Sequence, residues 1–436
     1  MGAYAADPKH NSNHSVVPWS AIGESYNTED VLEVVRFLLQ GEGIAYERAL
    51  CDVRLALHSL SKIGIPPMTL SSGDNVARLE QAMDNYLGTR GSTFLNNASS
   101  AFEMIFRYAN ITAGDEILFP AICSPAALLY PLAIKATPIF VDIDPVTLTI
   151  DPTDVLRKIT DRTKMVIISH IAGYPADMEA LTKCAQENGL IVLEDASEAI
   201  GGIYKGHHLG TLGDYGIFDF NQHNNITSFG EGGLLVSAVP ITNNLKLACH
   251  GKMDLTHVIQ DRAHDKASHE REHSSCVGTN DYGTELQAIG LLCQLARYES
   301  ILHIRECNTR FMNKRLSECP ALNIQPLGTK DIHPTYHLYT LNIDPKKAGG
   351  DISTLKLKLA DRGIATSSHF TPLYRLAIFS RLGYPIEAIK ETCPVAEQLF
   401  LHQITHASIY ALVNEQLEYM ATSILETIEE MQREAW

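Results

Sequence analysis

The 436-residue sequence contains no apolar stretch long enough to cross a lipid bilayer. Its most apolar segment, residues 121–134, includes Ser124 and two prolines, and it falls short of the roughly 20 residues that a membrane-spanning helix needs. The first 15 residues, MGAYAADPKHNSNHS, are polar and lack the apolar core of a signal peptide. We therefore expect a cytoplasmic protein that does not enter a membrane.

Positive charge is also scarce. The chain has 35 Lys and Arg against 51 Asp and Glu, which gives a formal net charge of −16, and its basic residues are scattered rather than clustered. Nucleic acids and anionic membrane surfaces are bound through basic patches. The charge pattern argues against both as partners and favours a small-molecule substrate.

The cysteines do not form a recognisable framework. They number nine, an odd count, and no C-x-x-C pair is present. We expect reduced thiols rather than disulfides or a zinc site. Residues 258–275 are polar and contain three histidines, but their spacing matches no set of metal ligands, so we predict a solvated loop and no metal.

The hydrophobic pattern divides the chain into three parts. Residues 1–73 are predicted to form an N-terminal tail and a helical segment. Residues 74–310 alternate short apolar runs with helical periods, which is typical of βαβ units and a mainly parallel sheet with helices on both faces. Residues 311–436 predict a smaller C-terminal α+β domain. One long helix is expected over residues 286–316, and the overall class is α/β.

Several segments follow one another in the order found in a known family. They read LEQAMDNYLG, LNNASSAF, AGDEILFPA, PIFVDIDPVTLTIDP, HIAGYPADMEAL, LIVLEDASEAIGG, GHHLGTLGDYGIFDF, ITSFGEGGLLVS, GTNDYGTELQAIGLLCQL, SSHFTPLY and CPVAEQL. Together they resemble the sugar aminotransferases of the DegT/StrS type, which are fold-type-I pyridoxal phosphate enzymes. The resemblance spans roughly residues 74–430 and implies the aminotransferase fold.

The resemblance also implies roles for single residues. Backbone amides at Ala98 and Ser99 would hold the cofactor phosphate at a helix N-terminus. Asp195 would pair with the pyridine nitrogen and so let the ring act as an electron sink. Asn280 would reach the phosphate of a partner subunit, which implies a homodimer with a shared active site. His369 and Tyr374 align with a loop that approaches substrate.

One departure from the family pattern decides the chemistry. The family has a lysine between Phe-Ser-Phe and Gly-Glu-Gly-Gly, and this lysine bonds to the cofactor. Counted forward from Phe218 the position is Asn224, and counted back from Gly230 it is Asn225, because this chain holds one extra residue. No lysine occurs between Lys205 and Lys246. An asparagine amide is not nucleophilic, so an ordinary transaminase is excluded.

Four further positions differ from the resemblance. Asp219 replaces a serine that the family uses on the phosphate, and a carboxylate there would repel a phosphate dianion by roughly 4 kcal/mol at 4 Å and an effective dielectric of about 20. Glu198 replaces Gln or His, Ser124 replaces an aromatic ring that stacks on the pyridine, and Tyr282 replaces an arginine. Two of these changes add negative charge, so together they indicate an altered site.

Three functions remain open from the sequence. In the first, the protein holds pyridoxamine or pyridoxal phosphate without a covalent bond, with His223 as the base in place of lysine, on a keto-sugar or related compound. In the second, no cofactor binds, and Asp195, Glu198 and Asp219 act on an amine or polyol. In the third, the chain is a non-catalytic partner of an active homologue.

Overall fold

The computed structural model describes residues 26–64, 70–71, 73–237, 279–368 and 371–435. The histidine-containing segment 258–275 and His369 lie outside these residues. The chain divides into two compact units, Met1–Gly73 and Asp74–Trp436. The first unit contains a pair of contacting helices, α1 (Thr28–Leu38) and α2 (Ile44–Ser61), and the side chains of Leu32 and Leu50 are buried there.

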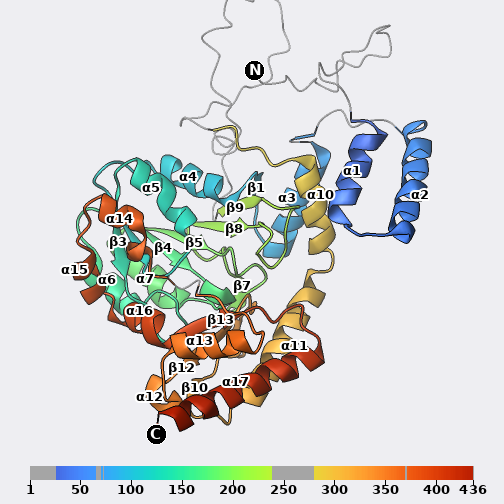
Figure 1. Ribbon diagram of the computed structural model, residues 1–436. Coiled ribbons are helices and arrows are strands. Elements are labelled where there is room, and N and C mark those ends of the chain that lie inside the picture. The colour runs from blue at the N-terminus through green and yellow to red at the C-terminus, as the bar shows by residue number, and fades with distance from the viewer. Residues whose placement is uncertain (1–25, 65–69, 72, 238–278, 369–370, 436) are drawn as a thin grey trace, which may run out of the picture. The chain divides into compact units, whose positions relative to one another are not determined.

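A seven-stranded sheet forms the centre of the second unit (Figure 1). Its strands, in spatial order, are β1 (Ser92–Leu95), β9 (Gly233–Ser237), β8 (Tyr215–Asp219), β5 (Ile191–Asp195), β4 (Thr163–Ser169), β2 (Glu116–Pro120) and β3 (Thr137–Val141). Only β9 runs opposite to the other six. The carboxyl ends of β4, β5 and β8 therefore meet at one edge, which is where open α/β sheets bind ligands.

Alternation along the strands builds two apolar layers. Within β2, Ile117 and Phe119 join one buried cluster while Leu118 joins the other, because successive side chains point to opposite faces. Residues of α4 (Ala98–Tyr108), α5 (Leu129–Ala133) and the turn η2 (Pro125–Leu128) pack in the first cluster. Residues of α3 (Asp74–Leu87), α7 (Met178–Asn188), α10 (Glu285–Leu295) and α11 (Tyr298–Leu316) pack in the second, and α6 (Pro152–Lys158) contributes Val155 to it. The predicted parallel sheet with helices on both faces is confirmed.

The C-terminal part has a core of its own. A small sheet joins β10 (Leu322–Asn323), β12 (Tyr339–Ile343) and β13 (Ile404–Ala407). Three helices surround it, α12 (Pro345–Ala348), α13 (Ile352–Asp361) and α17 (Asn414–Glu434), and α17 lies beside α11 and α13 (Figure 1). The predicted apolar stripe of the last helix is buried here, at Leu417, Met420, Ile424, Ile428 and Met431.

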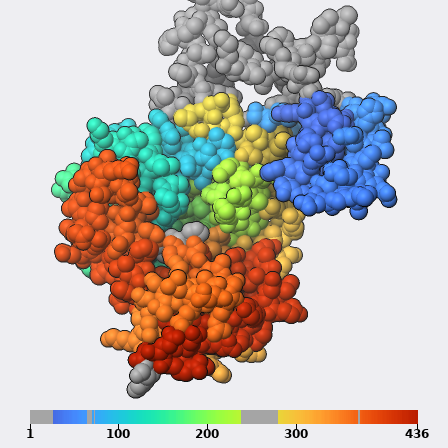
Figure 2. Space-filling view, viewed as in Figure 1, coloured from blue at the N-terminus to red at the C-terminus, as the bar shows by residue number. Residues whose placement is uncertain are grey.

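Further short elements complete the second unit. A third sheet consists of β6 (Ile203–Tyr204), β7 (His207–His208) and β11 (Ile332–His333). The short helical elements are α14 (Ala377–Arg381), α15 (Ile386–Glu391), α16 (Pro394–Gln398), η3 (Ile171–Gly173), η4 (Leu373–Arg375) and η5 (Leu399–Gln403). In Figure 2, the orange-red atoms of the segment from η4 to α16 lie against the cyan atoms of the sheet domain.

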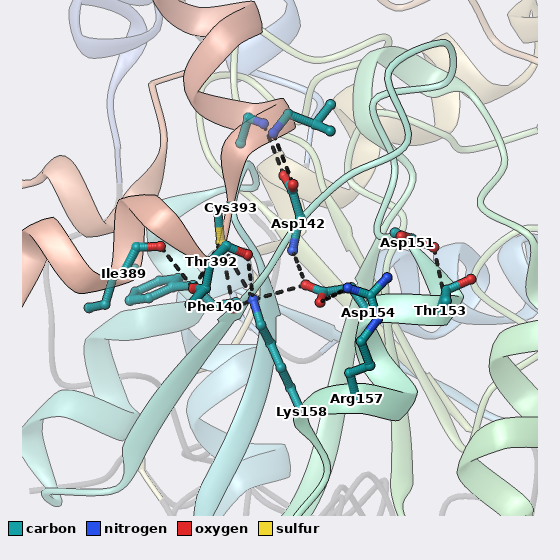
Figure 3. Close-up of polar contacts among 12 residues, drawn as sticks. Phe140, Asp142, Asp151, Thr153, Asp154, Arg157, Lys158, Ile389, Thr392 and Cys393 are labelled. Carbon is teal, nitrogen blue, oxygen red and sulfur yellow. Dashed lines mark hydrogen bonds and ion pairs between the residues drawn. The ribbon is translucent and has the colours of Figure 1, made fainter.

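A partly buried lysine joins this C-terminal segment to the large sheet (Figure 3). Lys158 Nζ donates to the carbonyl oxygens of Phe140, at 2.7 Å, and Thr392, at 2.9 Å. The same amine lies 2.9 Å from the carboxylate of Asp154. Because its partners come from β3, α6 and the turn before α16, Lys158 ties three separate parts of the chain together.

An aspartate completes the junction. Asp142 follows β3, and its two carboxylate oxygens accept from the backbone N–H groups of Val395 and Ala396, each at 2.9 Å. These N–H groups belong to the first turn of α16, where helix donors have no partner within the helix. The backbone N–H of Asp142 donates to Asp154 at 2.8 Å (Figure 3). The motif CPVAEQL thus has a structural role in holding α16 to the sheet.

The long helix expected over residues 286–316 is interrupted. α10 ends at Leu295 and α11 begins at Tyr298, with Arg297 outside helical geometry at φ −119° and ψ 13°. Tyr298 is buried, and its hydroxyl donates to the carbonyl of Ile200 at 2.6 Å. We attribute the break to this tertiary contact, because the sequence at the break contains neither Gly nor Pro.

Candidate functional site

Three carboxyl groups gather at the carboxyl ends of β5 and β8. Asp195 is the last residue of β5, Glu198 follows three residues later, and Asp219 is the last residue of β8. The negative charge of Asp195 raises the pKa of both Glu198 and Asp219, which shows that the three groups share one electrostatic environment. The structure thus brings together the three acids singled out from the sequence.

Asp195 is 3% exposed, and burial raises the pKa of its carboxyl. Hydrogen bonds oppose that shift: the backbone N–H of Ser197 donates to Oδ1 at 3.2 Å, and the hydroxyl of Ser169 donates as well. Among the described residues, no Lys or Arg lies within salt-bridge distance of Asp195. His170 is the basic group that lowers the pKa of Asp195. A buried carboxylate with no Lys or Arg beside it is suited to a ligand that brings its own positive charge.

Glu198 is the most strongly shifted of the three. Burial is the main cause that raises its pKa to about 8, and the Asp195 charge adds to it. The backbone N–H of Ala172 donates to Oε2 and partly offsets the shift, while Oε1 lies 3.9 Å from Nε2 of His337. Glu198 is therefore largely protonated at neutral pH and can donate a proton there.

Asp219 is held by its own loop. Its two oxygens accept from Asn221, at 3.0 Å from the backbone N–H and 2.6 Å from the side-chain amide. Burial nevertheless raises the pKa of Asp219 to about 6, with smaller contributions from Asp195 and Glu231. The group is thus mostly ionised at pH 7 and readily protonated in mild acid.

These acids should lower the free energy of unfolding by an amount that depends on pH. The pKa of Glu198 is higher in the folded state, about 8, than its ordinary value of 4.5, so the fold loses stability as pH rises between these values. The side chain of Glu198→Gln stays neutral at every pH. Above pH 8, we expect its free energy of unfolding, measured by urea titration, to exceed that of the wild type by roughly 2–4 kcal/mol. The difference should shrink towards zero near pH 5.

The matched control is Glu318→Gln, on an exposed glutamate at the end of α11. Its effect on the free energy of unfolding should be within about 0.5 kcal/mol of the wild type at every pH. A Glu198→Gln advantage that is the same at pH 5 and pH 9 would show that Glu198 does not titrate inside the fold.

The phosphate-binding turn implied by the resemblance lies at the start of α4. Ala98 is the first residue of that helix and Ser99 the second, and the Asn97 side chain caps it by accepting from the N–H of Ser100 at 2.9 Å. A Cβ on Gly233 of β9 would lie 2.4 Å from the carbonyl oxygen of Asn97, so only glycine allows β9 to approach this turn. The N-terminal N–H groups of α4 are thus placed beside the strand ends.

Ser124 does not offer the flat surface that an aromatic ring would. Its hydroxyl accepts from the N–H of Ala126 at 3.3 Å and caps η2. Its neighbour Cys123 is buried, and burial together with the charges of Asp195 and Glu198 raises the pKa of the thiol. Cys123 is thus near the acids, a placement that the sequence analysis missed.

The loop after β8 bears on which asparagine occupies the lysine position. The extra residue is best placed at Phe229, which has φ +57° and is 59% exposed, a backbone conformation rare for an aromatic residue. An insertion there would leave the forward count intact and make Asn224 the counterpart of the lysine, which stays a prediction. Asn224 is partly exposed.

His223 lies on the exposed side of the same loop. Its backbone N–H donates to Asn221 at 2.8 Å, and its Nε2 lies 3.2 Å from the side-chain nitrogen of Gln222. Among the described residues, these hydrogen bonds do not join His223 to Asp195, Glu198 or Asp219. The structure therefore does not bring His223 to the acids, and its role as a base stays a prediction.

A different histidine lies next to the acids. His337, between β11 and β12, is 2.8 Å through Nδ1 from Oδ1 of Asn225, and its Nε2 faces Glu198. Asn225 is 5% exposed and also donates to the hydroxyl of Tyr298 at 3.3 Å and to the carbonyl of Glu198 at 3.1 Å. The sequence analysis missed His337 because it is 112 residues from Asn225 along the chain.

Gly173 allows the segment that carries His337 to reach the site. A Cβ at Gly173 would lie 2.1 Å from Oγ1 of Thr335 and 3.0 Å from the carbonyl oxygen of Glu198, at φ +81°. We expect Gly173→Ala to lower the free energy of unfolding by about 3 kcal/mol, measured by urea titration. Gly363→Ala, at φ +74° with no atom within 4 Å, should lose only about 1 kcal/mol. Equal losses would contradict the contact.

The remaining predicted residues have different surroundings. Asn280 is exposed, beside a segment in which Tyr282 bridges Leu95 at the end of β1. Tyr374 is fully buried, and its ring lies 5.5 Å from that of Phe140 in the core. The structure thus places Tyr374 in the apolar core and does not bring it to the acids. Whether Asn280 reaches a partner subunit stays a prediction.

The arrangement agrees with a family model described as the DegT/DnrJ/EryC1/StrS aminotransferase family, which matches residues 66–425. The chain belongs to this family. The match covers most of the chain, and the resemblance inferred from the motifs is confirmed.

Solved structures share this fold. The chain is similar to a putative sugar aminotransferase, Spr1654 from Streptococcus pneumoniae, with 23% identity, 84% of this chain and 94% of that chain covered, and a TM-score of 0.73. DesV of S. venezuelae shows 27% identity, coverage of 88% and 96%, and a TM-score of 0.71. Helicobacter pylori PseC shows 24% identity, coverage of 84% and 94%, and a TM-score of 0.71.

Two other classes of site were sought in the described part of the chain. No helix there is both long and apolar enough to span a membrane. No group of three or more His, Cys, Asp or Glu residues there is arranged to hold a metal ion.

The cofactor of the DegT/DnrJ/EryC1/StrS family can be tested against these residues. Asp195 fits a protonated pyridine nitrogen, because it is a buried carboxylate with no Lys or Arg beside it. The N-terminus of α4 fits a phosphate, whereas Asp219 opposes one unless it is protonated. Neither candidate for the lysine position, Asn224 or Asn225, has a side chain that could form the covalent bond. Asp195 and the α4 N-terminus fit the ring nitrogen and the phosphate of a pyridoxal-type cofactor.

Proposed function

We propose that the chain is a biosynthetic enzyme that holds pyridoxamine or pyridoxal phosphate non-covalently and acts on a keto-sugar or a related keto or amino compound. The substrate class follows relatives described as a sugar aminotransferase and as an aminotransferase in the biosynthesis of pseudoaminic acid. Spr1654 is also known in a pyridoxamine phosphate form. An asparagine in place of the family lysine would not form the covalent bond that ordinary transamination uses, which supports a different reaction.

The observation that carries the proposal is the buried carboxylate of Asp195, which has no Lys or Arg beside it. A protonated ring nitrogen would supply a positive charge that pairs with it. When bound, the ring would serve as an electron sink. Glu198 holds a proton near neutral pH and would exchange it with the substrate, a role for which its pKa of about 8 is suited.

The direct test is a titration of the full chain with pyridoxamine phosphate, followed by absorption. We expect a saturable spectral change that dialysis reverses. Pyridoxamine without the phosphate should bind more weakly if the α4 N-terminus holds the phosphate. Lower pH should tighten binding between pH 7 and pH 5.5, because Asp219 becomes protonated through its pKa of about 6. The absence of any saturable change would remove the proposal.

A second function is favoured by the shared charge of the three acids. Burial and the charge of Asp195 raise the pKa of both Glu198 and Asp219, as expected for a site that takes a cationic ligand directly. On this alternative, no cofactor binds, and the acids perform proton transfer on an amine or polyol. An increase in melting temperature with amine metabolites, and none with pyridoxamine phosphate, would favour it.

We further propose a cytoplasmic homodimer in which Asn280 reaches the site of the partner subunit. The exposure of Asn280 in the single chain is compatible with this role. Sedimentation of the wild type should report twice the chain mass of 48.1 kDa. If it does, Asn280→Ala should weaken cofactor binding without changing that mass.

A further inference from the structure

A closed network of side chains lies behind the acids. Asn225 is its centre, and the side-chain amide contacts three groups: the ring of His337, the hydroxyl of Tyr298 and the carbonyl oxygen of Glu198. Tyr298 is 1% exposed and Asn225 is 5% exposed. Buried polar atoms need hydrogen-bond partners, and these contacts give the polar atoms of Asn225 and Tyr298 specific ones.

The network determines which nitrogen of His337 carries the proton. The carbonyl oxygen of Glu198 can only accept, so the Asn225 group 3.1 Å from it must be the amide nitrogen. The other end of the amide, Oδ1, therefore faces Nδ1 of His337 at 2.8 Å and must accept from it. The neutral ring then has its proton on Nδ1, which makes Nε2 an acceptor.

The acceptor Nε2 faces the carboxyl of Glu198, with Oε1 at 3.9 Å. A small rotation of the glutamate or one bridging water would complete a hydrogen bond across this distance. The backbone fixes the spacing, because Ala172 donates its N–H to Glu198 Oε2 and accepts the N–H of His337 at 3.0 Å. Arg305 also donates to the carbonyl of His337 at 3.0 Å.

We propose that His337 and Glu198 share a proton, and that Asn225 makes this possible by fixing the tautomer of His337. The proton moves from Oε1 of Glu198 to Nε2 of His337 and back, so the pair changes between two neutral groups and an ion pair without gaining or losing a proton. The pair thus stores a proton beside Asp195. His337 and Asn225 are positioning residues, and Glu198 is the group that faces the site.

This inference deepens the proposed function, and it can be tested without a cofactor. Nitrogen-15 labelling of histidine reports the tautomer of each ring by NMR. We expect neutral His337 to carry its proton on Nδ1 in the wild type, while the exposed His333 shows the ordinary preference for Nε2. His337→Gln assigns the signal. A wild-type His337 with its proton on Nε2 would overturn the proposal.

Infrared spectra then report the protonated carboxyl of Glu198, identified as the band that Glu198→Gln removes. Asn225→Ala should move His337 to the ordinary tautomer and shift this band, as His337→Gln should. Asn225 does not touch the Glu198 carboxyl, so the shift would be transmitted through the ring. The matched control is Thr335→Val, because the Thr335 hydroxyl also donates to the carbonyl of Glu198, at 2.6 Å, while the amide of Asn225 is left in place.

Thr335→Val should leave both the tautomer and the band unchanged. If Thr335→Val reproduces the effect of Asn225→Ala, the effect comes from a loosened backbone at Glu198, and the proposal fails. Titration of the wild type with pyridoxamine phosphate separates this failure from that of the proposed function. A protein that binds no cofactor but shows the Nδ1 tautomer and the transmitted shift would retain the proton-sharing pair and lose only the cofactor.

Discussion

Asp195→Asn is expected to weaken the binding of pyridoxamine phosphate about 10- to 100-fold. The variant keeps the size of the side chain and removes the negative charge that would pair with the protonated ring nitrogen. A hydrogen bond to a charged group contributes about 1.5–3 kcal/mol, which corresponds to this range of affinity. Calorimetric or absorption titration at pH 7 measures the change.

The same substitution should raise stability, which distinguishes lost binding from lost folding. Burial raises the pKa of Asp195, so the fold loses stability as pH rises from 3.8 through the folded value, and an amide avoids that loss. We expect a higher melting temperature for Asp195→Asn at pH 7 without ligand. Asp361→Asn, on an exposed residue of α13, should change neither quantity. A variant that binds the cofactor normally would remove Asp195 from the site.

Asn224→Lys is expected not to restore transamination. The substitution supplies the amine, but Asp219 still opposes the phosphate, and Ser124 provides no ring to stack on the pyridine. Adding Asp219→Ser should tighten cofactor binding at pH 7.5 by at least about tenfold, because it removes repulsion between like charges. Spectral titration and amine-transfer assays with keto-sugars compare the single and double variants. Strong turnover by Asn224→Lys alone would show that Asp219 and Ser124 matter little.

Asn225→Lys is the variant to compare with Asn224→Lys, because either asparagine could stand at the lysine position. Asn225 is buried among His337, Tyr298 and Glu198, so a lysine there would place a charged amine where an amide makes three contacts. We expect that variant to lose several kcal/mol of stability, roughly 3–5 kcal/mol. Asn224 is partly exposed, and Asn224→Lys should cost less than about 1 kcal/mol. The opposite order would place the family lysine at Asn225.

Much of the fold could be read from the sequence because local pattern and burial agree. The runs at residues 116–120 and 215–220 alternate between two buried layers, and both are strands in the structure. Asp195 could be identified because acidic residues at the end of a buried strand are unusual and match the family motif. The interruption between α10 and α11 could not be predicted, since it depends on Tyr298 meeting Ile200.

The part of the site formed by His337 and Asn225 could not be predicted for a related reason. His337 and Asn225 are far apart in sequence, and neither has a neighbouring residue that marks it as functional. His223 attracted attention because it precedes the lysine position, yet its loop turns it outward. Tyr374 aligned with a substrate loop, but its ring is held in the core by Phe140. Proximity in the chain was a poor guide to proximity in the fold at these positions.

The most direct test of the account is a search for any lysine that bonds to the cofactor. The full chain would be incubated with pyridoxal phosphate, reduced with borohydride and mapped by peptide mass, with and without excess pyridoxamine phosphate. We predict that pyridoxamine phosphate binds saturably and protects no lysine from labelling. A single lysine that is labelled stoichiometrically, and protected by pyridoxamine phosphate, would contradict the claim that this site holds its cofactor without a covalent bond.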